Sequence, residues 1–315
     1  MKKLFNGTVV LVAALTLFLF VGGLVVDNPL AYSQSKKNGL NEFVTSDGVT
    51  LRYQDVGTGQ PFVMIPGWSQ TAAMWKYQIA EFSKKYRVLA IDMRGHGMSD
   101  KPDNGYNIQR LSMDVHEFIT GLNLKNVIIM GHSMGTSVIW GYYDLFGPDR
   151  LAKLILVDQM PFITSNPAWS KEELETSGAI FTPQALYDTC NAIAGPKGVE
   201  TRTAFVGGMF PCLKVEEIPE YNWIVQENLK LPGEYAATLL YNHCTQDWRP
   251  LLKHIKLPTL VVGAKCGHIP WKSMEWVSEQ IPGAELLMFQ GKEDGGSHFM
   301  FLENPKKFNR RLVLS

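Results

Sequence analysis

The stretch Gly131-His132-Ser133-Met134-Gly135 decides the fold of this chain. An apolar run at residues 126–130 precedes it, and a helix-like segment begins at Met134. Where Gly-x-Ser-x-Gly stands between a strand and a helix, its glycines let the chain turn sharply and leave the serine hydroxyl clear of the backbone. The alternative is a glycine-rich turn with an incidental serine. The strand–turn–helix context favours the first interpretation, in which Ser133 is the nucleophile of a serine hydrolase.

Short apolar stretches alternate with amphipathic, helix-like stretches on both sides of this turn. We predict helices near residues 75–84, 108–122 and 273–280, and Asp47-Gly48 is typical of a β-hairpin turn. Nearly continuous apolar strands separated by helices indicate a parallel sheet that is covered on both faces. The sequence therefore predicts an α/β fold with a mostly parallel, eight-stranded sheet flanked by helices, with strands at 42–46, 49–56, 61–65, 86–91, 126–130, 154–157, 259–262 and 285–289.

The alternation stops between residues 161 and 256, which lack strong strand patterns. This segment is too long for an ordinary connection, so we expect a folded insertion. We predict a helical lid at 161–256, inserted after the sixth strand, over a core formed by residues 42–160 and 257–315. Its predicted helices lie near residues 171–177, 183–194, 199–207 and 233–242.

The first 33 residues are typical of an export signal. Met1-Lys2-Lys3 is basic, residues 9–26 are almost entirely apolar, and Ala31-Tyr32-Ser33 offers a cleavage site. The apolar stretch is nearly long enough to span a bilayer, so an uncleaved membrane anchor is the alternative. Residues 34–41 would then form a polar tether. In both cases we expect the rest of the chain outside the cytoplasm, either secreted or anchored facing outward.

The composition points to a small, mostly neutral binding partner. Thirty basic and 30 acidic side chains give a formal net charge of zero, which argues against a nucleic-acid partner. An exported compartment permits disulfides, but the cysteine spacing leaves all three pairings open, and buried free thiols remain the alternative. The four cysteines are Cys190, Cys212, Cys244 and Cys266.

A serine nucleophile needs a base that removes its proton, and His298 is the candidate among seven histidines. It follows the last predicted strand, in a loop near the C-terminus. His132 neighbours the nucleophile but points elsewhere if Ser133 points into the site. His96 lies in a tight turn, where we expect it to shape the backbone near the pocket. His268 follows the seventh predicted strand and is harder to dismiss than the histidines in helical patterns, which are His116, His243 and His254.

Further motifs resemble those of the α/β-hydrolase superfamily, close to its lid-bearing esterases, lactonases and cofactor-free haloperoxidases. The resemblance covers about residues 42–315 and implies that family's fold and serine-type chemistry, but it is poorly specific for substrate. Serine rather than aspartate at the turn disfavours the epoxide-hydrolase and haloalkane-dehalogenase branches. The matching stretches are Ile65-Pro66-Gly67-Trp68, Asp92-Met93-Arg94-Gly95-His96-Gly97-Met98-Ser99, Gly131–Gly135, Val157-Asp158 and Gly296-Ser297-His298.

The resemblance also implies an oxyanion hole made of two backbone N–H groups. One belongs to Met134, the residue after the nucleophile. The other belongs to Trp68, in the run Pro66-Gly67-Trp68-Ser69. Such donors face the oxygen on which charge develops during attack. Pro66 stands where the family commonly has histidine, but the N–H that matters comes later in the loop.

The acid of the triad is where the chain departs from the family. Most relatives carry an aspartate after the seventh strand, at the place of Cys266, and a thiol cannot stabilise an imidazolium as a carboxylate does. Some relatives carry the acid after the sixth strand, where this chain has Asp158. The resemblance then implies a triad of Ser133, Asp158 and His298. The alternatives are a dyad without an acid, or a carboxylate just before the base, from Asp294 or Glu293.

We expect hydrolysis of carboxylic esters, lactones included, with an apolar or aromatic group. The large apolar side chains of the insertion favour such substrates. Acyl transfer or perhydrolysis on the same triad, and a binding protein without catalysis, are the alternatives. Cys266-x-His268 has no second pair at zinc-like spacing, and phosphate or dinucleotide motifs are missing, so we expect neither metal nor cofactor. The candidate pocket residues are Trp169, Phe181, Met209, Trp223 and Trp271.

Overall fold

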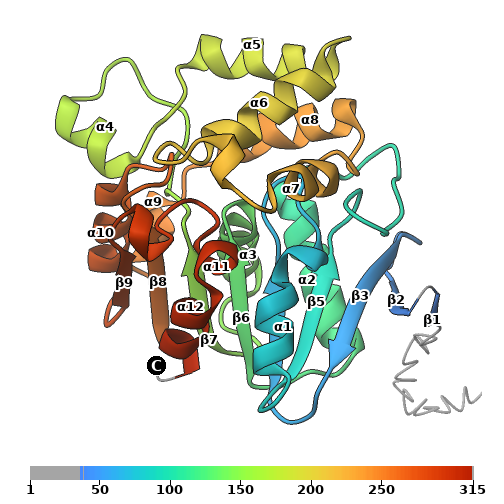
Figure 1. Cartoon of the computed structure of the whole chain (residues 1–315). Helices are drawn as coiled ribbons and strands as arrows, with labels where there is room; N and C mark the ends of the chain where they lie inside the picture. The colour runs from blue at the N-terminus through green and yellow to red at the C-terminus, as the bar shows by residue number, and fades with distance from the viewer. Residues whose placement is uncertain (1–35, 38, 314–315) are drawn as a thin grey trace, which may run out of the picture. The chain divides into compact units, whose positions relative to one another are not determined.

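The computed structural model describes residues 36–37 and 39–313. In that part of the chain one sheet has nine strands in the order β1-β2-β3-β5-β4-β6-β7-β8-β9. The strands from β5 to β9 in this order run parallel, whereas the first three pair antiparallel. A mostly parallel sheet with flanking helices confirms the predicted fold class (Figure 1). The strands are β1 Lys36–Lys37, β2 Leu40–Val44, β3 Thr50–Val56, β4 Pro61–Ile65, β5 Arg87–Asp92, β6 Val127–His132, β7 Leu151–Val157, β8 Thr259–Ala264 and β9 Glu285–Phe289.

The sheet begins earlier in the chain than predicted. Lys36 pairs with Asn41 and Lys37 pairs with Leu40, so part of the segment expected as a polar tether at 34–41 belongs to the sheet. The expected number of eight strands was therefore too low by one. Backbone N–H and C=O groups pair whatever the side chains are, so a two-residue polar edge strand leaves no hydrophobic pattern in the sequence.

The sheet separates two hydrophobic clusters, because alternate residues of a strand face opposite sides. In β4, Val63 and Ile65 lie in one cluster, while Phe62 and Met64 lie in the other. Helices α2, α3 and α10 pack in the first cluster, and η1, α1, α11 and α12 pack in the second. The bounds are η1 Ala72–Trp75, α1 Lys76–Phe82, α2 Ile108–Gly121, α3 Met134–Phe146, α10 Trp271–Gln280, η3 Lys292–Asp294, α11 Met300–Glu303 and α12 Pro305–Val313.

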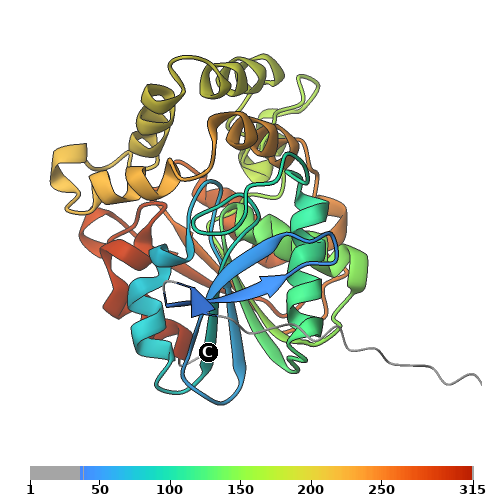
Figure 2. The same ribbon diagram turned by 90° about the vertical axis from the view of Figure 1, so that its right-hand side faces the viewer.

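The segment between β7 and β8 is helical, apart from a single bridge between Thr164 and Phe181. Figures 1 and 2 show its helices stacked over one end of the sheet. Helices α4 and α5 have the bounds expected from the sequence, whereas α7 was not predicted. The elements are α4 Lys171–Ser177, α5 Pro183–Ala194, α6 Gly198–Gly208, η2 Val215–Glu217, α7 Tyr221–Asn228, α8 Gly233–Cys244 and α9 Arg249–Leu252.

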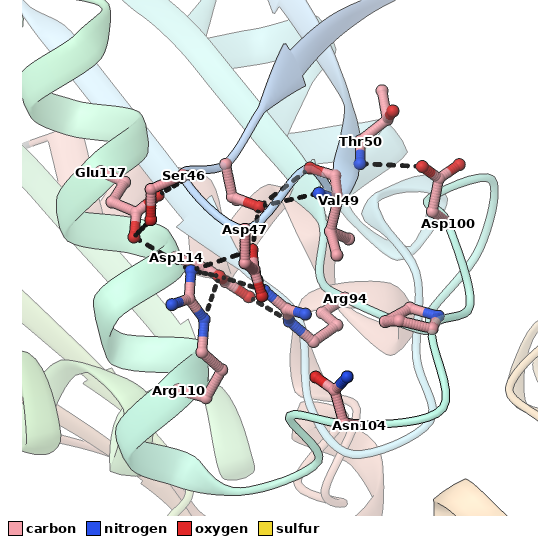
Figure 3. Close-up of polar contacts among 12 residues, drawn as sticks. Ser46, Asp47, Val49, Thr50, Arg94, Asp100, Asn104, Arg110, Asp114 and Glu117 are labelled. Carbon is pink, nitrogen blue, oxygen red and sulfur yellow. Dashed lines mark hydrogen bonds and ion pairs between the residues drawn. The ribbon is translucent and has the colours of Figure 1, made fainter.

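A charged network ties the hairpin between β2 and β3 to the loop that follows β5 (Figure 3). The fully buried Arg94 donates two hydrogen bonds of 2.8 Å to Asp114 of α2 and one of 2.9 Å to Asp47 of the hairpin turn. Arg110 donates at 2.7 Å to Asp114 Oδ1, which also accepts one of the two bonds from Arg94. A buried charge is tolerated only when it is paired. The network therefore fixes the Arg94 backbone, two residues before His96.

The predicted export signal at 1–33 lies outside the described residues and stays a prediction. Within residues 36–37 and 39–313, the helices are too short or too polar to cross a bilayer.

Candidate active site

Ser133 lies at the turn between β6 and α3, with φ 51° and ψ −123°. A positive φ is uncommon outside glycine, so the surrounding bonds must hold this conformation. The Ser133 N–H donates to the Val157 carbonyl at 2.8 Å, and the Thr136 N–H donates to the Ser133 carbonyl at 2.7 Å. These bonds set the Ser133 side chain at the end of β6, beneath the helices of the insertion.

The two glycines of the elbow are required by close packing. A Cβ on Gly131 would lie 2.4 Å from the carbonyl carbon of Gly135. One on Gly135 would lie 2.5 Å from the Ile65 carbonyl oxygen. Real Cβ atoms do not approach backbone this closely, so larger residues at either position would push the helix away from the strand.

His298 and Asp158 meet although 140 positions separate them in the chain. His298 Nδ1 lies 2.7 Å from Asp158 Oδ2, and both side chains are completely buried. Asp158 follows β7 and adopts φ 51°, while its N–H donates to the Val262 carbonyl at 2.8 Å. In the ionised form that a triad uses, Asp158 only accepts, so Nδ1 of His298 then carries the proton and Nε2 is the basic nitrogen. His298 Nε2 is buried and has no partner among the described residues.

Burial disfavours charge on both members of this pair. It lowers the pKa of His298 to about 3. It raises the pKa of Asp158 well above the ordinary value, and the backbone N–H of Ala264 offsets only part of that rise. The imidazole of the resting protein is therefore neutral, which is the state that a general base requires.

The other candidates for the acid are engaged elsewhere. Asp294 accepts the Gln290 N–H at 2.9 Å and forms an ion pair with Lys307. Glu293 is exposed. Cys266 forms a disulfide with Cys212 of the insertion, and its N–H donates to the Gly296 carbonyl at 2.8 Å. Of the sequence-predicted acids, Asp158 is the one that the fold brings to His298. Cys190 and Cys244 are buried free thiols.

The two predicted oxyanion donors flank the elbow. Met134 is the first residue of α3, so its N–H has no acceptor within the helix. Trp68 is buried, lies in the loop after β4, and lines the same cavity as Ser133. Its indole Nε1–H donates to the Ala236 carbonyl of α8 at 2.8 Å. Trp68 thus lines the cavity of the proposed nucleophile while its ring is bonded to the insertion.

His96 holds the loop that carries Trp68. Its Nδ1 lies 2.8 Å from the Arg94 carbonyl, and its Nε2 lies 3.2 Å from the Ser69 nitrogen. A carbonyl only accepts and an N–H only donates, so Nδ1 is protonated and Nε2 is the acceptor. Ser69 has φ 57°, and the bond from His96 stabilises that conformation directly after Trp68. The sequence placed His96 near the pocket backbone but gave no partner.

The buried imidazole of His96 makes this loop sensitive to acid. Burial lowers the pKa of His96 to about 4, below the ordinary 6.5. Between those pH values the unfolded chain binds a proton that the folded protein does not, so the stabilisation by His96 is full above pH 6.5 and is lost as the pH falls toward 4. His96→Gln keeps an acceptor but does not titrate. The difference in free energy of unfolding between the two proteins should therefore shrink by about 2 kcal/mol from pH 6.5 to pH 5.

Urea unfolding of both proteins at pH 7.5, 6.5 and 5 measures this difference. The other titrating groups are common to both proteins, so their contributions cancel in the difference between the two free energies of unfolding. A difference that stays constant or grows at low pH would exclude a neutral, hydrogen-bonded His96.

A small cavity of about 30 Å³ adjoins Ser133. Two of the predicted pocket residues, Phe181 and Met209, line this cavity. Polar side chains interrupt an otherwise apolar wall at Gln159, His243 and His268. The full lining is Trp68, Ser133, Gln159, Met160, Ile163, Ile180, Phe181, Phe205, Met209, Leu240, His243, Cys244, His268 and Ile269.

Three tryptophans predicted for the pocket do not line it, and this part of the prediction needs correction. Each of the three rings instead lies against a cationic side chain. From the cationic group to the ring centroid, the distance is 4.4 Å for Arg249 and Trp169. It is 4.2 Å for Lys76 and Trp223, and 4.9 Å for Lys265 and Trp271. An indole ring attracts cations at the surface and also packs against apolar neighbours. Apolar character alone therefore does not distinguish a residue of the cavity wall from a partly exposed residue elsewhere.

Two histidines near the base were not assigned a role from the sequence. The His132 ring lies 4.3 Å from the His298 ring, and its Nε2 donates to the His298 carbonyl at 2.9 Å. The His268 ring lies edge-on to His298 at 4.4 Å. His298 is thus held between two imidazoles and one carboxylate. The position of His268 after β8 was the signal that could have found it.

The chain is similar to known proteins along most of its length. The model of the alpha/beta hydrolase fold family matches residues 60–180, which include the elbow. A non-heme chloroperoxidase of Kitasatospora aureofaciens is 29% identical over 277 residues, covering 85% of this chain and 96% of that protein. The chain belongs to the α/β-hydrolase superfamily.

Other α/β-hydrolases are similar to this one over different lengths. The solved structure of an esterase from Exiguobacterium antarcticum superposes with a TM-score of 0.77 at 26% identity, covering 86% of this chain and 97% of that one. A soluble epoxide hydrolase of a Corynebacterium strain is 31% identical, but over 36% of this chain and 40% of its own length. The long matches therefore include a haloperoxidase and an esterase, and this epoxide hydrolase matches over a shorter stretch.

Proposed function

We propose that this α/β-hydrolase cleaves carboxylic esters, lactones included, of small apolar or aromatic molecules. The observation that carries the proposal is the buried His298–Asp158 pair beside a strained serine elbow, with the basic Nε2 of His298 left unbonded. A serine with this support forms an acyl-enzyme. An epoxide hydrolase of this superfamily would use a carboxylate nucleophile at the elbow, which Ser133 does not supply.

The reaction follows from the positions of these groups. Ser133 Oγ attacks the ester carbonyl carbon, and its proton passes to His298 Nε2. The imidazolium is stabilised by Asp158, and the N–H groups of Trp68 and Met134 hold the oxyanion. When the tetrahedral intermediate collapses, His298 returns the proton to the leaving alcohol. Water then attacks the carbonyl carbon of the acyl-enzyme and gives a proton to His298. As the acyl–oxygen bond breaks, His298 returns that proton to Ser133 Oγ and the carboxylic acid leaves.

The helical insertion at 161–256 is proposed to act as a lid. The cavity of about 30 Å³ beside Ser133 is far smaller than the roughly 300–1,000 Å³ typical of ligand sites. It holds little more than water. A substrate therefore needs the insertion to move before it reaches Ser133, and the residues of the insertion that line the cavity would then set substrate choice.

Perhydrolysis is the second candidate, and the similarity to a non-heme chloroperoxidase favours it. Hydrogen peroxide in place of water would release a peracid from the same acyl-enzyme. Product analysis with peroxide and alcohols as competing acceptors separates hydrolysis from perhydrolysis and acyl transfer. Ligand binding without turnover is the remaining alternative, and a Ser133-dependent hydrolysis of a nitrophenyl ester would exclude it.

Export remains part of the proposal. Residues 1–33 are proposed to act as a cleaved signal or as a membrane anchor that leaves the hydrolase unit outside the cytoplasm. The Cys212–Cys266 disulfide supports this, because disulfides persist mainly in oxidising compartments.

A fluorophosphonate probe tests the proposed nucleophile. We expect the probe to label the folded protein on Ser133, as mapped by mass spectrometry, and to abolish hydrolysis of a short-chain nitrophenyl ester in proportion to labelling. Active protein that carries no label on Ser133 would exclude the mechanism.

A further inference from the structure

Two histidines in the cavity beside Ser133 lack the hydrogen bonds that buried polar groups normally make. His243 lies in α8 and is 3% exposed, and His268 lies in the loop after β8. The Nδ1 atom of each is buried without a partner among the described residues. Both side chains line the cavity that adjoins Ser133.

Three other histidines, all completely buried, have a partner at one ring nitrogen or at both, and the unbonded Nε2 of His298 is the nitrogen that the proposed mechanism assigns to Ser133. His96 bonds to two backbone groups, His132 bonds to the His298 carbonyl, and His298 bonds to Asp158. An unpaired buried nitrogen is unfavourable, and native proteins contain few of them. His243 and His268 both line this cavity, which suggests that their partner is a group that enters with the substrate.

The charge state of the two rings limits what that group can be. Burial lowers the pKa of His243 to about 3 and that of His268 well below the ordinary value, with the neighbouring His298 adding to the second shift. Both rings are therefore neutral near pH 7. A neutral imidazole offers one donor and one acceptor, which suits a hydroxyl or a carbonyl and gives no charge pairing to a carboxylate.

We propose that the substrate is an ester or lactone whose acyl part carries a neutral hydroxyl or carbonyl group next to a short apolar chain, and that His243 and His268 bind this group. The inference rests on the proposed esterase function. The acyl part is assigned because it is bonded to Ser133 between the two steps, beside the cavity that this residue lines. The apolar wall accepts the chain, and the two imidazoles select the polar group.

The test compares two esters of equal size. The nitrophenyl esters of 3-hydroxybutanoic and 3-methylbutanoic acid differ only by a hydroxyl in place of a methyl group. We expect wild-type protein to have the higher kcat/KM for the hydroxy ester. His243→Leu and His268→Leu should each lower kcat/KM for the hydroxy ester by about 10-fold to 100-fold more than for the methyl ester. The ratio of the two constants is the readout, so a general loss of activity does not imitate the effect.

Matched variants make the test decisive. His254 is exposed and outside the cavity, so His254→Leu should leave the ratio unchanged. His243→Gln retains hydrogen bonding and should keep more of the preference than His243→Leu. A wild-type protein that cleaves both esters equally, or discriminates only on the alcohol side, would overturn the inference while esterase activity stands. Ser133→Ala distinguishes failure of this inference from failure of the proposed esterase function. If the Ser133→Ala variant still hydrolyses the esters, the proposed function itself is wrong.

Discussion

Replacing Ser133 by alanine should lower kcat/KM for a short-chain nitrophenyl ester by about 10⁴-fold to 10⁶-fold. The expected loss is large because Ser133 is the proposed nucleophile and an alanine side chain cannot form the acyl-enzyme. Residual turnover would come from the oxyanion donors and from substrate binding alone. Steady-state hydrolysis of the ester by both proteins measures the effect, and labelling by a fluorophosphonate should disappear together with turnover.

Ser137 provides the matched control for this variant. It lies one turn further along α3, is completely buried, and its hydroxyl has no partner among the described residues. Ser137→Ala removes the same oxygen from the same helix and should keep kcat/KM within a factor of about three. Retention of more than a tenth of wild-type activity in Ser133→Ala would contradict the assigned nucleophile.

Asp158→Asn should lower turnover by about 10⁴-fold with little change in the free energy of unfolding. Asparagine fills the same space but carries no charge to stabilise the imidazolium, and it permits the wrong tautomer of His298. The variant should therefore lose kcat more than substrate affinity. Ester hydrolysis and urea unfolding, measured on the same preparations, separate the two effects.

Asp294→Asn is the counterpart that tests the competing acid. Asp294 lies in η3 near the base in sequence, but it pairs with Lys307 and accepts the Gln290 N–H. Its variant should keep nearly full turnover. If Asp294→Asn were the damaging substitution and Asp158→Asn were harmless, the assignment of the acid would be reversed.

The sheet and the elbow were predictable because their signals are local. The strands of a covered parallel sheet are nearly continuous apolar runs, and β4 and β9 have the bounds expected from such runs. The departures have physical reasons. The edge strand β1 consists of two lysines, which leave no hydrophobic pattern in the sequence. The short α7 alternates polar and apolar residues too irregularly to give a clear helical period.

The site was predictable in its chemistry but not in its supporting contacts. The residues Ser133, Asp158 and His298 follow strand ends, and the ends of parallel strands meet at one edge of a sheet. By contrast, the bond between His96 and Ser69 and the bridge between Cys212 and Cys266 join segments with no shared pattern. Such contacts depend on loop conformation, which hydrophobic periodicity does not encode.

Trp68 gives the proposed lid a consequence for timing. The backbone of this residue is the proposed oxyanion donor, whereas its indole is bonded to α8 of the insertion. If α8 swings outward, it must either break that bond or pull the donor loop with it. Substrate would therefore enter while the Trp68 N–H is displaced from its place in the oxyanion hole. Closure of the lid over the bound substrate would bring this N–H back. Admission and bond cleavage would alternate within each cycle, so that the rate of lid motion would set an upper limit on turnover.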